Sequence, residues 1–398
     1  MPLLPPLLLA LAVSALLAGC FAAASPSNDT EIDPRLLLTT DEIARVDGYE
    51  SEKHLAKTRD GYLLTLHRVR SLGGPTERPP LLLLHGLLSG SDGFVLGGPG
   101  RSAAYVFADA GYDVWLGNFR GNFYSRRHVS LSPAERAFWM FSFQEMGEQD
   151  IPAMLDVMFA TTAARRTSVV CHSAGCTALL AMLALPTSRH SRAIRMAAML
   201  APAYIPHRSI FSNILTPGLV KYVDQHGPYE ILPRSKSLLM LLDRLCSVHS
   251  RYLNVCKLII SITTQKEPQD MNNSRLSFDI AHLVAGASVY STIHFTQLIK
   301  SGQFRMYDYG EEDNMKQYGQ PEPPLFDLSQ ITAPISIHYG HKDTTVTREE
   351  AERLFGALPL RIGLFEVPDK KFTHVDFLIS DNAKEVLYDN LTKIIKSY

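Results

Sequence analysis

The sequence contains Thr167-Ser-Val-Val-Cys-His-Ser-Ala-Gly-Cys-Thr-Ala-Leu-Leu-Ala-Met-Leu183, in which a serine separates a strand pattern from a helix pattern. Residues 167–171 are mostly β-branched and apolar, which predicts a short buried strand. Residues 174–185 are rich in Ala and Leu, which predicts a buried helix. The serine therefore lies at the apex of a sharp strand-to-helix turn. Such a turn exposes a nucleophile in enzymes with the fingerprint G-x-S-x-G, although Cys171 replaces the first glycine here.

The composition is that of a globular protein with room for a large core. The chain has 398 residues, of which 46% are hydrophobic and 20% are charged, and its formal net charge is −1. This length suits one large domain or one domain with an insertion. Because neither sign of charge is in excess, we expect no nucleic-acid partner and no attraction to an anionic membrane surface.

Residues 1–24 differ from the rest of the chain because they are rich in Pro, Leu and Ala and carry no charged side chain. The apolar run Leu7–Ala18 is short for a bilayer span and is followed by small residues, which is typical of a secretory signal peptide. We therefore expect a secreted protein with no stable transmembrane anchor after removal of the signal. A retained signal anchor and a lipidated Cys20 are the alternatives.

The cysteines and sequons fit a secreted glycoprotein. Cys20 leaves with the signal, so four of the five cysteines remain. Cys246 and Cys256 lie close together and are expected to form a disulfide. Cys171 and Cys176, which flank the serine turn, are expected to be buried free thiols that act as small apolar residues. Glycosylation sequons occur at Asn28, Asn272 and Asn390.

Apolar strand patterns alternate with helical patterns along most of the chain. Such alternation predicts an α/β fold with a mostly parallel central sheet and helices on both faces. A hairpin that turns at Arg59-Asp-Gly61 opens the domain. Continuous apolar runs such as Leu81–Leu84 are typical of strands buried on both faces of a parallel sheet. The remaining strands are expected at 112–116, 167–171, 194–200, 334–339 and 361–367.

The strand pattern stops between residues 201 and 328. This insert contains the helix-like segments Ser237–Leu242 and Lys257–Ile260 and ends in the acidic, Pro-rich stretch Tyr307–Pro324. We expect a helical cap over the carboxyl edge of the sheet, where ligands bind in open α/β folds. The predicted organisation is a signal peptide at 1–24, the first part of the core at 25–200, a cap or lid at 201–328 and the second part of the core at 329–398.

Three polar residues, Ser173, Asp343 and His374, each follow a predicted strand. They supply a hydroxyl nucleophile, a carboxylate and a base, in the chain order Ser, Asp, His. Taken alone, Ser173 could equally cap a helix, and Asp369 and Asp376 are rival carboxylates. Asp376 is too close to His374 in sequence for the strand-end arrangement, and Asp369 lies upstream on the same loop. We therefore predict Ser173, Asp343 and His374 as the catalytic set.

Backbone donors for an oxyanion are also predicted. The strand at Leu81–Leu84 leads into His85 and Gly86, and Gly86 lets the backbone approach a substrate, so the N–H of Leu87 is one donor. The N–H of Ala174 at the start of the helix is the other, because the helix dipole favours negative charge there. The remaining histidines near these motifs are interpreted as structural: His85, His172 and His294.

Longer stretches resemble the acid lipases, the group of gastric, lysosomal acid and lingual lipases with many arthropod relatives. The most specific is Ala108-Asp-Ala-Gly-Tyr-Asp-Val-Trp-Leu-Gly-Asn118, followed by Arg120-Gly-Asn122. Further matches are Leu84–Ser89, Phe138–Phe143 and His374–Phe377. The resemblance extends over nearly the whole chain from Thr40 onward.

This resemblance implies an α/β-hydrolase fold with an inserted lid. It implies hydrolysis of triacylglycerols or cholesteryl esters at a lipid–water interface, without a metal or cofactor. It also implies the catalytic roles of Ser173, Asp343 and His374, the oxyanion donors Leu87 and Ala174, and the disulfide Cys246–Cys256. Protein partners are not implied.

The chain departs from the family at the elbow, where Gly-His-Ser-Gln-Gly is usual and Cys171 and Ala174 stand here. After the acid, Thr344-Thr-Val-Thr347 replaces a Leu-Ala-Asp-like run. We predict a secreted serine ester hydrolase, with lysosomal delivery as the alternative location. A carboxylesterase for shorter or specialised esters and a catalytically weak lipid-binding protein are the alternative functions. The variant Cys171→Gly is expected to retain or raise activity.

Overall fold

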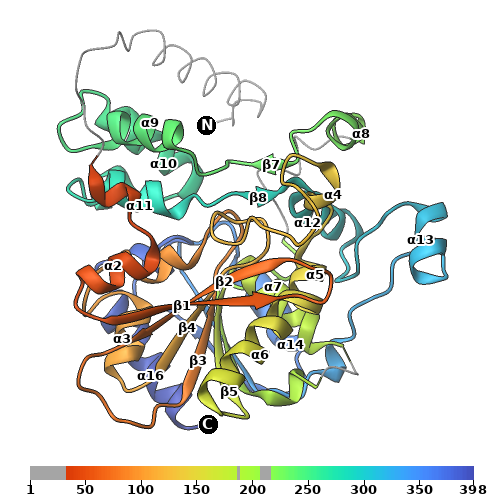
Figure 1. Ribbon diagram of the computed structural model, residues 1–398, viewed down its shortest axis with the longest axis horizontal. Coiled ribbons are helices and arrows are strands. Elements are labelled where there is room, and N and C mark those ends of the chain that lie inside the picture. Colours follow the sequence, from red (N-terminus) through yellow and green to blue (C-terminus); the bar gives the residue numbers. More distant parts are fainter. Residues whose placement is uncertain (1–32, 186–188, 207–216) are drawn as a thin grey trace.

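The computed structural model describes residues 33–185, 189–206 and 217–398. In this part of the chain, the centre is an eight-stranded sheet in the order β1-β2-β4-β3-β5-β6-β9-β10 (Figure 1). β2 pairs antiparallel with β1 and β4, and all other neighbours pair parallel. The mostly parallel α/β fold predicted from the sequence is therefore confirmed. The strands are β1 (Glu50–Lys57), β2 (Leu63–Arg70), β3 (Pro80–Leu84), β4 (Asp113–Gly117), β5 (Thr167–His172), β6 (Ile194–Leu200), β9 (Ile335–Tyr339) and β10 (Arg361–Glu366).

The central strands are buried on both faces. Every residue of β3, β4, β5 and β9 is buried, which explains why their sequences are continuous apolar runs rather than alternating ones. The edge strands β1 and β10 are only partly buried. The sheet is thus the rigid layer from which the strand-end loops project.

Helices cover both faces of the sheet (Figure 1). Helices α3 and α16 lie on one side, and α6, α7 and α14 lie on the other. A capping box formed by Thr347 and Glu350 begins α14. The core helices are α2 (Thr40–Val46), α3 (Ala103–Asp109), α4 (Arg136–Trp139), α5 (Phe143–Glu145), α6 (Ile151–Thr162), α7 (Ala174–Leu183), α14 (Arg348–Ala357), α15 (Asp376–Ile379) and α16 (Asp389–Lys396).

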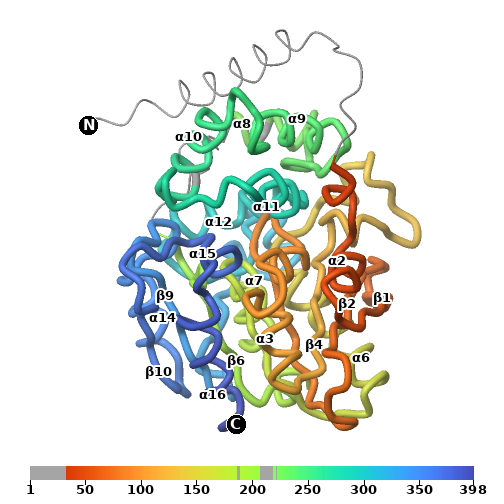
Figure 2. The backbone as a smooth tube through the Cα atoms, turned by 90° about the vertical axis from the view of Figure 1, so that its left-hand side faces the viewer, coloured from red at the N-terminus to blue at the C-terminus, as the bar shows by residue number. Residues whose placement is uncertain are grey.

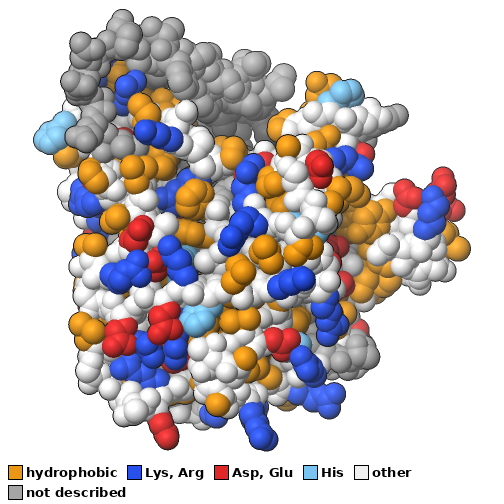
Figure 3. Space-filling view, viewed as in Figure 1, with side chains coloured by type: hydrophobic (Ala, Val, Ile, Leu, Met, Phe, Trp, Pro, Cys, Tyr) orange, Lys and Arg blue, Asp and Glu red, His pale blue; other side chains and the backbone are white. Residues whose placement is uncertain are grey.

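The segment between β6 and β9 forms helices above the carboxyl ends of the strands (Figures 1 and 2). Its helices α9 and α10 are joined by the disulfide Cys246–Cys256, the pair that the sequence predicts. Helix α13 projects from the molecule and is covered with charged side chains (Figure 3). The elements are α8 (Pro217–His226), β7 (Glu230–Ile231), α9 (Lys236–Cys246), α10 (Leu253–Thr264), α11 (Leu276–Leu283), β8 (Ala287–Ser288), α12 (Val289–Ser301) and α13 (Glu311–Tyr318).

Among the described helices, none combines the length and the apolar character needed to cross a membrane. The predicted signal peptide at 1–24 and the sequon at Asn28 lie outside the described residues. Asn272 and Asn390 are both exposed, as glycosylation requires. The domain limits at 200 and 328 stay predictions, although the helical segment does lie between β6 and β9.

Candidate active site

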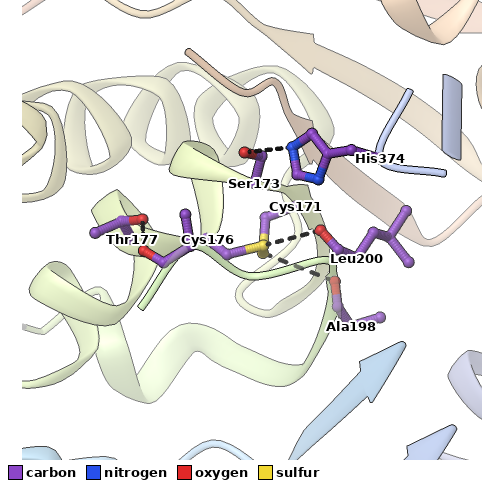
Figure 4. The surroundings of a disulfide bond; sticks show 8 residues. Cys171, Ser173, Cys176, Thr177, Ala198, Leu200 and His374 are labelled. Carbon is purple, nitrogen blue, oxygen red and sulfur yellow. Dashed lines mark hydrogen bonds between the residues drawn. A yellow bond between two sulfur atoms is a disulfide. The ribbon is translucent and has the colours of Figure 1, made fainter. Parts of the chain in front are cut away.

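The turn between β5 and α7 holds Ser173 in a backbone conformation that L-residues seldom adopt, with φ 51° and ψ −122°. Gly175 permits the turn, because a Cβ there would collide with the carbonyl groups of Leu84 and His85. Ser173 occupies the N-cap position of α7, yet its side chain does not cap the helix. Its Oγ instead lies 2.9 Å from Nε2 of His374 (Figure 4).

His374 connects the serine to a buried carboxylate. Its Nδ1 lies 2.8 Å from Oδ2 of Asp343, whose side chain is 0% exposed, against 14% for His374. The other oxygen of Asp343 accepts hydrogen bonds from the N–H groups of Thr345 and Val346, at 2.8 and 2.9 Å. These bonds fix the carboxylate, so Nδ1 of His374 donates to it and Nε2 is turned toward Ser173.

The rival carboxylates bond elsewhere. Asp376 accepts from the N–H and Oγ1 of Thr373 and pairs with Lys266 at 2.5 Å. Asp369 accepts from the N–H of Lys371 and from the amide of Asn382. Within the described residues, Asp343 is thus the carboxylate that contacts the ring of His374.

The two expected oxyanion donors line one small pocket with Gly86. In the described part of the chain, neither the N–H of Leu87 nor that of Ala174 donates a hydrogen bond to another residue. A Cβ on Gly86 would lie 3.0 Å from the Cβ of Ser173, so glycine allows the loop to approach the serine closely. The arrangement leaves two N–H groups beside the serine available for a substrate oxygen.

His172 has a place at the site that the sequence did not reveal. Its Nε2–H donates to the carbonyl of His374 at 3.1 Å, and the two rings lie 4.8 Å apart. Burial, reinforced by the neighbouring His374, holds the pKa of His172 well below its ordinary value. A neutral His172 therefore anchors the backbone of the loop that carries His374. The other two histidines are structural as expected: His85 bonds to Phe119 and Asn122, and His294 bonds to Ser142 and Arg305.

The expectation that Cys171 and Cys176 are free thiols is wrong, because the structure joins them in a disulfide. The sharp turn folds the first turn of α7 back beside the end of β5. It brings the two Cα atoms to 5.0 Å, well inside the range that a disulfide spans. The two cysteines are five residues apart in the sequence, and it is the conformation of the turn that brings them together.

The cap also reaches the catalytic loops. The segment Gln265–Asp270, which follows α10, forms three ion pairs with the loops that carry Asp343 and His374. The pairs are Lys266 with Asp376 at 2.5 Å, Glu267 with Lys342 at 2.8 Å, and Asp270 with Lys371 at 3.1 Å. Asp376 and Lys371 flank His374 in sequence, and Lys342 precedes Asp343.

The pocket beside the proposed oxyanion donors is a cavity of about 20 Å³ with mainly apolar walls. Phe143 and Met146 from the core and Phe295 from the cap contribute to these walls. The described residues contain no group of three or more His, Cys, Asp or Glu side chains arranged to hold a metal ion. The polar groups that the structure brings together at Ser173 are a hydroxyl, an imidazole and a carboxylate.

Comparison with known proteins identifies the family. One family model, described as a partial α/β-hydrolase lipase region, matches residues 40–98, and another, described as the α/β hydrolase fold, matches residues 79–360. Lipase 1 of Drosophila melanogaster is 34% identical over 90% of this chain and 80% of its own length. Gastric triacylglycerol lipase of Homo sapiens is 31% identical over 91% of this chain and 92% of its own.

Solved structures agree on the fold. One from Sulfolobus solfataricus superimposes with a TM-score of 0.61 over 93% of this chain and 99% of its own, at 14% identity. At that identity the likeness concerns the fold alone, whereas the lipase relatives are similar in sequence along almost the whole chain. The chain therefore belongs to the acid lipase family of α/β-hydrolases, and it is a lipase-type ester hydrolase.

Proposed function

We propose that the protein is a secreted serine ester hydrolase that cleaves neutral lipid esters, such as triacylglycerols or cholesteryl esters, through an acyl-enzyme on Ser173. The observation that carries this proposal is the row of contacts from Oγ of Ser173 through His374 to Asp343, at 2.9 and 2.8 Å. A hydroxyl next to an oriented base is the requirement for nucleophilic catalysis of acyl transfer. The similarity to gastric triacylglycerol lipase of Homo sapiens supports the substrate class.

In the first half of the proposed reaction, Nε2 of His374 takes the proton of Ser173 while Oγ attacks the ester carbonyl. The N–H groups of Leu87 and Ala174 bind the oxyanion that forms, and each such donor is worth about 10²–10³ in rate. Asp343 stabilises the imidazolium. His374 then gives its proton to the departing alcohol, which leaves the acyl group on Ser173.

In the second half, a water molecule replaces the alcohol. His374 takes a proton from this water, which attacks the acyl carbonyl through the same oxyanion geometry. Oγ of Ser173 leaves and regains its proton from His374, and the fatty acid is released. Each step uses groups of this chain and water.

Apolar side chains on the cap support attachment to a lipid surface. Apolar side chains that leave water on contact with a lipid surface stabilise that contact. Hydrophobic side chains are visible over α8 in Figure 3, at the cap end of the molecule. The exposed large apolar residues of the cap include Tyr222, Leu232, Val248, Leu258 and Ile262.

The test is hydrolysis of emulsified trioleoylglycerol, cholesteryl oleate and p-nitrophenyl butyrate at acid and neutral pH. Wild type should turn over at least one long-chain ester, and Ser173→Ala should lose activity by more than about 10³-fold. Ser329→Ala, at an exposed position in the short 3-10 helix Leu328–Gln330 before β9, is the matched control and should keep full activity. Absence of turnover by wild type, or turnover that survives Ser173→Ala, would overturn the assignment.

A carboxylesterase for shorter or specialised esters is the second candidate, because the contacts of Ser173, His374 and Asp343 suit an ester of any chain length. A series of p-nitrophenyl esters from acetate to palmitate separates the candidates. A kcat/KM that is at least tenfold higher for butyrate than for palmitate in droplets identifies the esterase.

Secretion is part of the proposal because three kinds of feature agree with it. These are the apolar residues 1–24, the two disulfides, and the exposed sequons at Asn272 and Asn390. Delivery to lysosomes is the alternative. Expression of the full chain in animal cells should place the protein in the medium, with a mobility shift after glycosidase treatment. Retention in a lysosomal fraction would support the alternative.

A further inference from the structure

The disulfide Cys171–Cys176 encloses the centre of the proposed active site. Cys171 is the fifth residue of β5 and Cys176 is the third residue of α7. The four residues between them include Ser173 and Ala174, so the covalent ring contains both the proposed nucleophile and one proposed oxyanion donor. Figure 4 shows Ser173 and His374 facing each other on one side of the turn, and the joined cysteines on the other.

The backbone inside this ring needs to be held. A non-glycine residue at a positive φ such as that of Ser173 costs on the order of 1–3 kcal/mol and persists only where the surroundings impose it. Two hydrogen bonds contribute: the N–H of Ser173 donates to the carbonyl of Leu200 at 2.9 Å, and the N–H of Cys176 donates to the carbonyl of Ser173 at 3.0 Å. The disulfide adds a covalent tie across the same turn.

The disulfide also explains how a cysteine replaces glycine two residues before the nucleophile. The side chain of Cys171 ends on Cys176 rather than on Gly175. The two sulfur atoms lie 3.8 and 4.0 Å from the carbonyl oxygens of Ala198 and Leu200 in β6 (Figure 4). Both cysteines are 0% exposed. The side chain that replaces glycine at position 171 therefore lies between the turn and β6.

We propose that the Cys171–Cys176 disulfide is a positioning element of the active site. It holds the turn in the conformation that directs Oγ of Ser173 at His374 and the N–H of Ala174 at the oxyanion. The inference rests on the proposed function of Ser173. Because both sulfurs are shielded from solvent, the bond acts as a permanent brace, and dithiothreitol added to the folded protein leaves activity unchanged.

The first test compares Cys171→Ala/Cys176→Ala with the matched control Cys246→Ala/Cys256→Ala, which removes the disulfide between α9 and α10. The readouts are kcat and KM on a soluble p-nitrophenyl ester, the rate of phosphonylation of Ser173 by a p-nitrophenyl phosphonate, and the melting temperature. The phosphonate also counts the competent sites, so kcat is expressed per reactive serine.

Loss of the elbow disulfide should lower kcat and the phosphonylation rate at least tenfold while KM changes less than twofold. The control pair should lower the melting temperature and keep kcat per reactive serine. A disulfide that served only stability would lower the melting temperature in both variants and leave kcat unchanged. A kcat within twofold of wild type in Cys171→Ala/Cys176→Ala overturns the proposal.

A second variant decides the case in which the first one does not fold. Cys171→Gly/Cys176→Ala introduces the glycine usual at this position and should fold, with a kcat between those of wild type and the double alanine variant. A kcat equal to that of wild type would mean that the disulfide does not contribute to kcat, which overturns the proposal. Peptide mapping of the alkylated, unreduced wild type gives an independent check, since alkylated Cys171 and Cys176 would overturn the inference.

These outcomes separate the inference from the proposed function. If wild type neither hydrolyses esters nor reacts with the phosphonate, the proposed function fails, whatever the peptide map shows. If wild type is active and the disulfide variants match it, the proposed function stands and the positioning role fails.

Discussion

At the scale of single residues, Asp343 determines which nitrogen of His374 carries the proton. Its Oδ2 accepts from Nδ1 at 2.8 Å, which leaves Nε2 to accept the proton of Ser173. The buried position of Asp343 excludes water that would otherwise compete for Nδ1. In the proposed reaction, this carboxylate also stabilises the imidazolium that forms during acyl transfer.

Asp343→Asn should lower kcat by about 10³–10⁴ and change KM less than threefold, because an amide can turn its N–H₂ toward Nδ1 and favour the wrong tautomer. Steady-state kinetics on p-nitrophenyl butyrate measures this loss. Asp369→Asn, which alters the rival carboxylate on the loop of His374, is the control and should remain within threefold of wild type. An equal loss in both variants would contradict the assignment of Asp343.

Glu148 links the stability of the protein to pH. Burial, with the nearby charge of Glu145, raises the pKa of Glu148 from 4.5 to about 7, while Gln144 and Arg120 oppose the rise. Between pH 4.5 and about 7, Glu148 is therefore protonated in the folded protein and ionised in the unfolded chain. Its free energy of unfolding decreases as pH rises from about 4.5 to 7, by up to roughly 3 kcal/mol.

Glu148→Gln should remove this dependence. Its melting temperature should exceed that of wild type at pH 7.5 and match it at pH 4, where wild-type Glu148 is protonated in both states. Differential scanning fluorimetry across pH 4–8 measures the two profiles. Glu385→Gln, at an exposed position, should follow the wild-type profile throughout. Parallel profiles of melting temperature against pH for Glu148→Gln and wild type would rule out Glu148 as the source of the pH dependence.

That Ser173, Asp343 and His374 lie together could be predicted from the sequence, because each one follows an apolar strand and parallel strands end at one edge of a sheet. The pairing of Cys171 with Cys176 could not, because it depends on the backbone angles of the turn between them. This pairing also reverses one expectation. Cys171→Gly leaves Cys176 as a lone thiol and opens the ring around Ser173, so we now expect this variant to lose activity.

At the scale of elements, the segment Gln265–Asp270 connects the cap to the loops that carry Asp343 and His374. Its three ion pairs differ in burial. The side chains of Lys266 and Asp376 are 15% and 4% exposed, whereas those of Lys342 and Glu267 are both 43% exposed. Breaking a buried pair leaves an uncompensated charge, while an exposed pair contributes little.

Lys266→Met should lower the melting temperature by about 3 °C, because the buried carboxylate of Asp376 loses its cation. Lys342→Met, which breaks an exposed pair of the same segment, is the control and should shift it by less than about 1 °C. Equal shifts in melting temperature would show that the buried ion pair stabilises the protein no more than the exposed one. Loosening of the loop of His374 should also reduce kcat more in Lys266→Met than in the control.

Elements were predicted with unequal success for a physical reason. The strands at 81–84 and 194–200 are recognisable because both faces are buried and the composition shows it. The contact between Lys266 and Asp376 joins residues 110 positions apart, and nothing in the local sequence of either marks the other. The cap was therefore predictable as a set of helices but not in its attachment to the catalytic loops.

At the scale of the whole molecule, the loops at the carboxyl ends of the strands carry Ser173, Asp343 and His374, and the cap lies above these ends (Figures 1 and 2). The cap also contacts the loop that carries Leu87, since the N–H of Ala285 donates to the carbonyl of Leu88 at 2.7 Å. With the cap in this position, the cavity beside Leu87 and Ala174 measures about 20 Å³, which holds about one water molecule. A long acyl chain does not fit such a cavity, so we expect the cap to move when the proposed long-chain ester reacts at Ser173.

A lipid surface is the agent that we expect to move it, because the exposed apolar residues of the cap gain by leaving water. Turnover of tributyrin should therefore rise about tenfold or more where its concentration passes the solubility limit and droplets form, as a pH-stat measures. Tethering the cap tests the cause. In Glu267→Cys/Lys342→Cys, a bismaleimide bridge should abolish this rise, and the same variant before bridging is the matched control. A hyperbolic curve without a break, or a bridged protein fully active on droplets, would mean that esters reach Ser173 with the cap in place.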